Sequence, residues 1–167
     1  MDNLYFGEKI IMNREQLKEF IWDNYSVRPD NPWVKYPDYE VFRHSGNRKW
    51  FAIIMSVTED RLGLKGDGIL DIVNFKCEQA LIGSLLGEEG FYPAYHMSKS
   101  SCITAALDGS VSDDKIKLLL FAGVSIASVA RRLGHASMTT TQKTYLHIIQ
   151  ELENKDVDLV MRTLSGL

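Results

Sequence analysis

Hydrophobic residues recur at two spacings along this chain, a helical one near its start and an alternating one through its middle. Leu17, Phe20 and Ile21 share one face of a helix, and Asn13 and Gln16 before them have the spacing of a capping box. Later segments are rich in β-branched and aromatic residues and are bounded by turn residues, as strands are. These segments are residues 39–44, 49–57, 69–77, 91–97 and 101–107.

Turn signals connect these segments into an α+β domain. The Ser-Gly-Asn sequence at 45–47 lies between the first two predicted strands and favours a hairpin. Residues 79–86 have helical spacing and are followed by Gly87, which ends a short helix. Pro93 lacks an amide N–H, so residues 91–97 lie at a sheet edge or form a loop. Helices set around a run of strands predict the α+β class.

Two helices are predicted after the last strand. Ser112 is a suitable N-cap, an apolar face follows it, and Gly123 can take the left-handed conformation that ends a helix. A second helix is expected over residues 125–134, and more helical spacing follows it. The chain is therefore interpreted as an α+β domain, residues 1–122, followed by a helical C-terminal tail, residues 123–167.

Composition and charge narrow the choice of partner. The 167 residues include 45% hydrophobic and 25% charged side chains, ordinary values for a globular protein, and the net charge is −3. No apolar run approaches the roughly 20 residues of a membrane span, so we expect a cytoplasmic protein without a membrane partner. Cys77 and Cys102 form no Cys-x-x-Cys motif and are predicted to be reduced and buried. In an acidic protein, nucleic-acid binding requires a local basic patch.

Four motifs, in order along the chain, resemble those of the YjbR/MmcQ-like family. They are NRKWFAIIM (47–55), LDIVNFKC (70–77), PAYHMSKSSCITAALDGS (93–110) and DDKIKLLL (113–120). The resemblance covers about residues 12–120. It implies a frataxin-like fold, a twisted antiparallel sheet with helices on one face, and it implies DNA binding. Where the family usually has Asn-Lys-x-His-Trp, this chain has Ser-Lys-Ser-Ser-Cys at 98–102, so no activity tied to that His and Trp is expected.

The tail resembles the C-terminal end of tyrosine recombinases, the phage-integrase family, over GVSIASVARRLGHASMTTTQKTYLHIIQEL, residues 123–152. By that resemblance His135 matches the late catalytic histidine and Tyr145 matches the nucleophile that links to DNA. The transition state of that reaction needs positive charge around it. The family's upstream Arg, Lys and His-x-x-Arg groups are not recognisable in this chain, so His135 and Tyr145 are interpreted as inactive remnants.

Basic residues surround the predicted hairpin turn, and phosphate contacts need only positive charge and reach. The candidate DNA-binding residues are Arg43, His44, Arg48 and Lys49 at the turn, with Arg131 and Arg132 in the tail. A solubilising turn, and cations near a helix C-terminus, are the alternative interpretations of these two groups. Trp50 is able to stack on a base, but alternation directs it toward the core or a half-buried face.

Aromatic and basic residues after the short helix suggest a small pocket. The candidates are Tyr92, Tyr95, His96 and Lys99. Alternatively, His96 is a structural histidine with satisfied hydrogen bonds. The acidic residues form no clustered ridge on a helix, so we expect no metal site and no cofactor.

The sequence as a whole predicts a non-enzymatic binding module with DNA as its expected partner. One alternative is a tyrosine-recombinase-type protein that works only with a partner chain supplying the missing arginines. Another is an interaction protein whose apolar helical tail contacts a second copy of the chain and forms a dimer.

Overall fold

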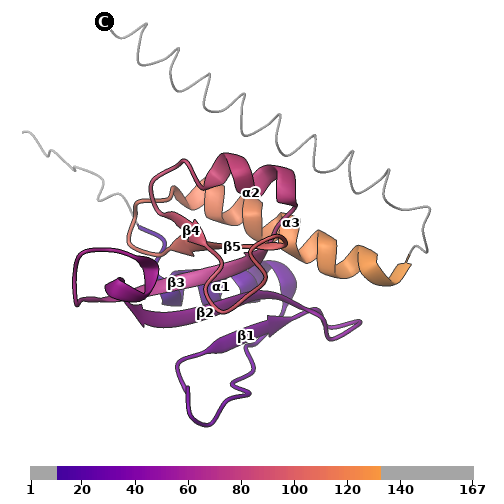
Figure 1. The fold of residues 1–167 in the computed structure, drawn as a ribbon. Coiled ribbons are helices and arrows are strands. Elements are labelled where there is room, and N and C mark those ends of the chain that lie inside the picture. Colours follow the sequence, from indigo (N-terminus) through magenta and orange to yellow (C-terminus); the bar gives the residue numbers. More distant parts are fainter. Residues whose placement is uncertain (1–10, 133–167) are drawn as a thin grey trace, which may run out of the picture.

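The computed structural model describes residues 11–132 of the chain, and the side chains of residues 11–124 (Figure 1). The elements in order are α1 (Arg14–Tyr25), β1 (Glu40–Arg43), β2 (Trp50–Thr58), the 3-10 helix η1 (Glu59–Leu62), β3 (Ile69–Lys76), α2 (Gln79–Leu85), β4 (Phe91–Pro93), β5 (Cys102–Ala106) and α3 (Asp113–Arg132). The predicted α+β class is confirmed.

The strands form a five-stranded antiparallel sheet in the order β1-β2-β3-β5-β4. Because β5 lies between β3 and β4, the last strand in the sequence is internal and β4 is at an edge. Pro93 ends β4, in agreement with its missing N–H. At the other edge, Asp30 and Val41 exchange two backbone hydrogen bonds of 2.8 Å, so a short bridge covers part of β1.

The first helix begins with the predicted capping box. The backbone N–H of Gln16 donates to Oδ1 of Asn13 at 2.9 Å, and the N–H of Asn13 donates to Oε1 of Gln16 at 3.0 Å. Leu17 and Ile21 are fully buried in the core. Ser26, with φ 52°, ends α1 in the left-handed conformation.

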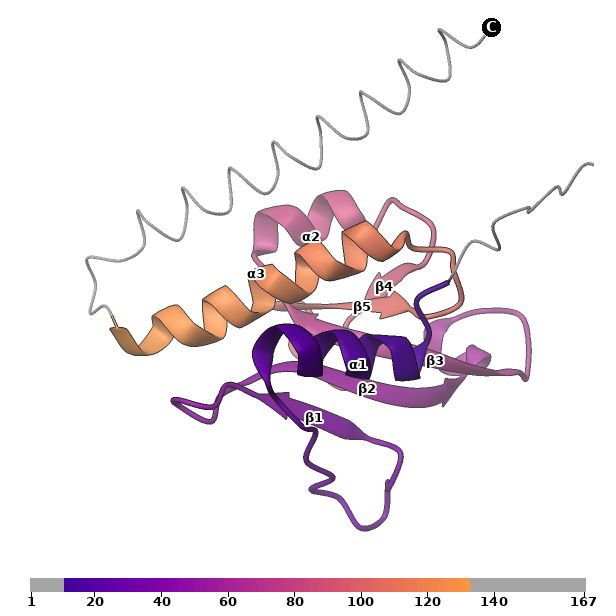
Figure 2. The same cartoon turned by 180° about the vertical axis from the view of Figure 1, so that it is seen from behind.

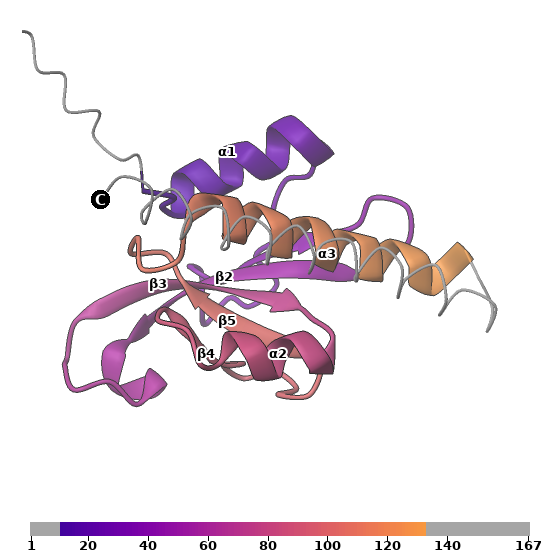
Figure 3. The same ribbon diagram turned by 90° about the horizontal axis from the view of Figure 1, so that it is seen from above.

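The α-helices share one hydrophobic core with one face of the sheet, and we call it the helix-side core. Figures 2 and 3 show α1 and α3 side by side on that face. This core includes Leu17, Phe42, Phe75, Leu81 and Ile116, so all three α-helices and the sheet contribute to it.

A second hydrophobic cluster lies on the opposite face of the sheet. Its buried members are Val41, Ile53, Met55, Val57 and Ile72. Loop and strand-end residues, among them Tyr39, Trp50 and Met97, pack against it. No α-helix of the described residues contributes to this cluster, and we call this side of the sheet the helix-free face.

A β-bulge shifts the alternation at the beginning of β2. Phe42 pairs with Ala52 but Arg43 pairs with Trp50, so Phe51 is an extra residue in the ladder. Phe51 and Ala52 both belong to the helix-side core. Trp50 therefore lies on the helix-free face, whereas unbroken alternation from Ala52 would have turned it toward the helices.

The helix end predicted at Gly123 is wrong, because α3 continues from Asp113 to Arg132 without a break. The expected second helix at 125–134 is therefore not a separate element up to residue 132. Gly123 is buried, and a Cβ built on it would lie 3.1 Å from the carbonyl oxygen of Phe51. This glycine allows α3 to pack closely on the sheet, a role that its sequence neighbours do not reveal.

The boundary expected between residues 1–122 and 123–167 falls inside α3. The helices predicted after residue 132 lie outside the described residues, and the division into a domain and a tail stays a prediction. Among the helices that the structure describes, none combines the length and the hydrophobicity needed to cross a membrane.

Candidate functional site

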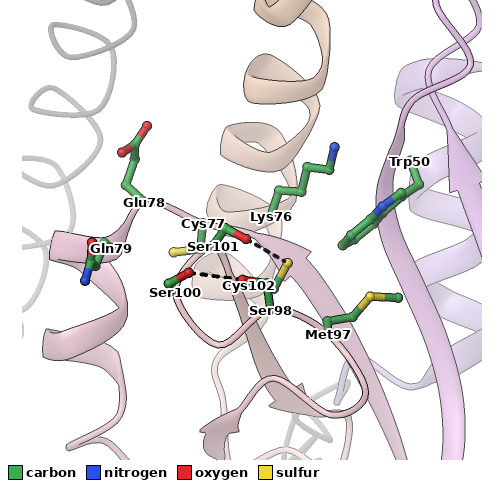
Figure 4. Close-up of a pocket in the computed structure, with 10 residues that line it drawn as sticks. All are labelled: Trp50, Lys76, Cys77, Glu78, Gln79, Met97, Ser98, Ser100, Ser101 and Cys102. Atoms are coloured by element: carbon green, nitrogen blue, oxygen red, sulfur yellow. Dashed lines mark hydrogen bonds between the residues drawn. The ribbon is translucent and has the colours of Figure 1, made fainter.

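A pocket of about 610 Å³ lies at the end of the sheet where β2 begins, β3 ends and β5 begins (Figure 4). It is lined by Trp50, Lys76, Cys77, Glu78, Gln79, Met97, Ser98, Ser100, Ser101 and Cys102. Figure 4 shows the indole of Trp50 across the pocket from Gln79 and Ser100. We call it the Trp50 pocket. Its volume falls within the range of about 300–1,000 Å³ that holds small organic ligands.

A buried polar network fixes the loop that carries the pocket's serines. Asn74 and Thr104 are fully buried, and the Thr104 hydroxyl donates to Oδ1 of Asn74. Asn74 Nδ2 donates to the carbonyl of Tyr95 at 2.8 Å, and the N–H of Tyr95 donates to Oγ1 of Thr104 at 2.9 Å. Fully paired buried polar groups specify one geometry. The loop at 94–101 is therefore held in a defined position against β3 and β5.

Trp50 and Lys76 give one side of the pocket both a ring and a positive charge. The two side chains are half-buried, and Nζ of Lys76 lies 5.0 Å from the ring centroid of Trp50, within the range of a cation–π contact. Burial, and next the nearby charge of Lys49, lower the pKa of Lys76. An ammonium that is partly desolvated and repelled by a like charge gains from a neighbouring anion. This side of the pocket is therefore suited to an anionic group.

Two thiols form the inner part of the pocket. Cys77 and Cys102 are free and buried, which confirms that the cysteines are buried and unpaired. Burial raises the pKa of Cys77 to about 12 and also raises the pKa of Cys102. Because the thiolate is the nucleophile and metal ligand, these raised pKa values disfavour reaction of either cysteine at neutral pH. The inner surface is neutral and suited to contact rather than to covalent chemistry.

The hairpin tip, residues 44–49, directly precedes Trp50. Nε of Arg43 lies 3.1 Å and Nη2 of Arg48 lies 3.0 Å from Oδ2 of Asp30, so one carboxylate offsets part of the predicted basic cluster. Lys49 is exposed. The half-buried His44 accepts a hydrogen bond of 3.2 Å from a turn amide through Nδ1. The structure thus brings all four predicted hairpin residues to the same end of the sheet as the Trp50 pocket.

The aromatic pocket residues suggested by the sequence lie elsewhere, on β4 and on the loop that follows it. Tyr92, Tyr95, His96 and Lys99 are not among the residues that line the Trp50 pocket. The rings of Tyr95 and His96 lie 4.0 Å apart, centroid to centroid, and Nζ of Lys99 lies 3.5 Å from the carbonyl oxygen of Ala94. Burial raises the pKa of Tyr92, followed by the charge of nearby acidic residues. A binding role for these four residues stays a prediction.

The remaining candidates belong to the end of the chain. Arg131 and Arg132 lie in the last turn of α3, where only the backbone is described. His135 and Tyr145 lie outside the described residues. Within residues 11–132, no three His, Cys, Asp or Glu side chains come together as a metal ion would require.

Sequence reasoning missed Lys76, Gln79 and the serines of the pocket. One signal was available, because the departure from the Asn-Lys-x-His-Trp motif at 98–102 supplies four of the ten lining residues. Small side chains replace the larger His and Trp in that motif. The other part of the pocket required knowledge of the bulge that turns Trp50 onto the helix-free face.

Comparison with known proteins identifies the family of this fold. The family model described as YjbR matches residues 22–122, more than half of the chain. The chain belongs to the YjbR family. Its similarity to the "Uncharacterized protein YyaQ" of Bacillus subtilis (strain 168) is 36% identity over 110 residues, covering 66% of this chain and 93% of YyaQ. The first of the two sequence resemblances is thereby confirmed.

Solved structures agree with the YjbR-family fold. A crystal structure of a Pseudomonas syringae protein has 40% sequence identity and a TM-score of 0.68, covering 70% of this chain and 99% of that one. A solution NMR structure from the same organism has 38% identity and a TM-score of 0.66, with 74% and 99% covered. A Deinococcus radiodurans protein, at 15% identity and a TM-score of 0.55, supports the fold alone.

The YjbR match ends at residue 122, so the resemblance of residues 123–152 to tyrosine recombinases lies outside it and stays a prediction. The likeness to frataxin also stays a prediction. The names of these YjbR-family relatives state neither an activity nor a ligand.

Proposed function

We propose that this YjbR-family protein is a non-enzymatic, cytoplasmic binding module whose partner is DNA. The supporting observation is the continuity of the hairpin tip with the Trp50 pocket at one end of the sheet. The Arg48 side chain is 67% exposed and Lys49 is exposed, and Trp50 and Lys76 follow them into the pocket. Positive charge beside a half-buried aromatic ring is a common arrangement for binding a nucleic-acid strand.

The charge balance of the hairpin tip is consistent with phosphate contacts. Asp30 carries one negative charge and is shared by Arg43 and Arg48, while Lys49 and Lys76 add two cations that repel each other. The local charge is therefore positive although the whole protein is acidic. Phosphate contacts fix the position of a protein on DNA without reading its sequence. We accordingly expect weak, salt-dependent binding without strong sequence preference.

Binding of fluorescent DNA at two salt concentrations, about 50 mM and 200 mM, tests the proposal. We expect the affinity to fall with salt, and Arg48→Gln/Lys49→Gln to reduce the slope of log affinity against log salt by about 1 to 2. Arg61→Gln/Lys65→Gln is the matched control, because it removes two exposed cations near the other end of β2. The control should bind as the wild-type protein does.

Two results would contradict the proposal. The first is the absence of binding at low salt and micromolar protein. The second is an equal loss of affinity in the hairpin variant and in the control variant, because general electrostatic attraction would then explain the binding.

The tail alternatives are tested separately. A recombinase that works with a partner chain predicts covalent protein–DNA adducts that Tyr145→Phe abolishes. A protein that dimerises through the tail predicts a mass by light scattering of twice the chain. We favour the binding module because the features that support it lie within the described YjbR domain.

A further inference from the structure

The surroundings of the Trp50 indole point to a ligand. The bulge at Phe51 turns this ring away from the helix-side core and onto the helix-free face. There it remains half-buried, with Met97 in the same pocket wall and the ammonium of Lys76 5.0 Å from its centroid. A ring face that meets a cation is accessible to polar groups and to solvent. That accessibility lets a flat ligand replace the ammonium over the indole.

Charged groups are separated along the pocket. Figure 4 shows Lys76 next to Trp50, with Glu78 and Gln79 beyond Cys77 on the far side. An anionic group is therefore favoured at the lysine side and disfavoured near Glu78. Gln79 offers both a donor and an acceptor to the edge of a ring, as amide side chains do for bases.

The serines add hydrogen-bonding capacity without charge. Oγ of Ser98 and Oγ of Ser100 lie 3.0 Å apart at the exposed rim of the pocket, and Oγ of the exposed Ser101 lies 3.8 Å from Sγ of the buried Cys102. Hydroxyl groups both donate and accept, so they tolerate several kinds of ring edge. A pocket with one stacking ring, a cation beside it, uncharged polar groups and an acidic group only at the far side fits a planar, polar-edged ring whose phosphate lies at the lysine side.

We propose that the Trp50 pocket binds one unstacked nucleobase of a single-stranded segment, with the indole stacked on the base and Lys76 contacting the adjoining phosphate. The inference rests on the proposed function, and it names the form of the nucleic acid that this site takes. A base inside a duplex is covered on both faces by its neighbours, so only an unpaired or displaced base can reach the ring. The hairpin tip then follows the phosphates of the same strand.

Fluorescence of Trp50 provides a direct test. Trp22 and Trp33 are exposed on α1 and on the loop after it, and Trp22→Phe/Trp33→Phe leaves Trp50 as the only indole. This full-length reporter is titrated with single-stranded decathymidylate, with the same strand carrying an abasic site at alternate positions, and with the corresponding duplex. We expect decathymidylate to quench Trp50 and to bind about tenfold tighter than the abasic strand or the duplex.

Two substitutions separate stacking from charge. Trp50→Leu keeps an apolar side chain in the wall and should lower affinity for decathymidylate about tenfold, with partial recovery in Trp50→Phe. Lys76→Gln keeps the length of the side chain and should reduce the salt dependence by about one phosphate contact. Lys65→Gln, an exposed cation remote from the pocket, is its control. Thermal melting confirms that each variant is folded.

The outcomes separate base capture by Trp50 from DNA binding by the protein as a whole. Equal affinity for decathymidylate and the abasic strand, with Trp50 fluorescence unchanged, would overturn base capture while DNA binding by the hairpin tip stands. If no DNA binds but thymidine 5′-monophosphate quenches Trp50 and Lys76→Gln weakens that effect, the ligand is a free nucleotide and the DNA function is overturned. If fluorescently labelled DNA also shows no binding and no probe changes the Trp50 signal, both proposals are overturned.

Discussion

The thiols of Cys77 and Cys102 show how far burial sets the chemistry of single residues in the Trp50 pocket. Both line the pocket, yet each has only 4% of its surface exposed. The pKa of Cys77, raised to about 12 by burial and then by the charges of Glu78 and Cys102, leaves almost no thiolate at neutral pH. The location of a cysteine in a pocket is therefore no indication of a nucleophile.

This protection gives a prediction at the residue scale. Ellman's reagent at pH 8 should react with neither cysteine of the folded protein on the timescale of free cysteine, and with both after unfolding in guanidinium chloride. Cys77→Ser and Cys102→Ser assign any residual reaction to one position. Rapid labelling of either cysteine in the folded protein would contradict the conclusion that both thiols are buried and protonated.

The Cys77 thiol also sets the direction in which pH changes the stability of the fold. A folded-state pKa raised from 9.0 to about 12 means that the folded protein holds this proton more tightly than the unfolded chain. The resulting stabilisation is fully present below pH 9 and is lost as pH rises toward 12. The raised pKa of Tyr25, caused by burial, acts in the same direction at higher pH. The raised pKa also predicts a rate. In the folded protein, the reaction of Cys77 with a thiol reagent should keep speeding up above pH 9, because the thiolate fraction is still increasing there.

At the scale of elements, Gly123 and Gly83 make a matched pair of helical glycines. Gly83 in α2 is exposed and a Cβ built on it meets nothing within 4 Å, whereas one on Gly123 would lie 3.1 Å from the backbone oxygen of Phe51. Alanine gains up to about 1 kcal/mol of helix propensity over glycine at either site. At Gly123, however, the added methyl group overpacks the contact with β2, and overpacking costs about 1–3 kcal/mol, which exceeds that gain.

We therefore expect opposite effects from the same substitution. Gly83→Ala should raise the free energy of unfolding by up to about 1 kcal/mol, and Gly123→Ala should lower it by about 1 kcal/mol. Urea denaturation followed by circular dichroism measures both values. Equal stabilisation by the two substitutions would show that α3 moves away from the sheet without cost.

The elements that sequence reasoning predicted are those with local signals. The capping box of Asn13 and Gln16 and the edge position of Pro93 depend on neighbours a few residues away. Gly123 was misinterpreted because glycine suits both a helix end and a close approach to a strand, and only tertiary packing separates the two. The Trp50 pocket escaped prediction because the bulge at Phe51 changes which face a residue occupies, and alternation alone does not reveal it.

At the scale of the whole molecule, the described residues form a closed fold. The helix-side core and the cluster on the helix-free face consist of residues from 12 to 124. YyaQ is covered to 93%, and the P. syringae protein to 99%, by 66% and 70% of this chain. These relatives have the YjbR fold with almost no additional length.

A stop codon after Arg132 should consequently leave a protein with a cooperative thermal transition and dispersed amide resonances. This truncation preserves α3, whereas a stop after Gly123 would cut the helix in its middle. Light scattering measures the mass of the full-length protein and of the protein truncated after Arg132. A dimer that becomes a monomer on truncation would support dimerisation through the tail. Loss of cooperative melting would show that residues 133–167 complete the core.

The two edges of the sheet bear on how the protein behaves when it is concentrated. The outer edge of β1 is partly occupied by the backbone of Asp30, and β4 is three residues long and ends in a proline without an N–H. A strand from another molecule thus meets no continuous row of donors and acceptors along either described edge. These two features disfavour the growth of ordered fibres through edge-to-edge pairing of the described sheet.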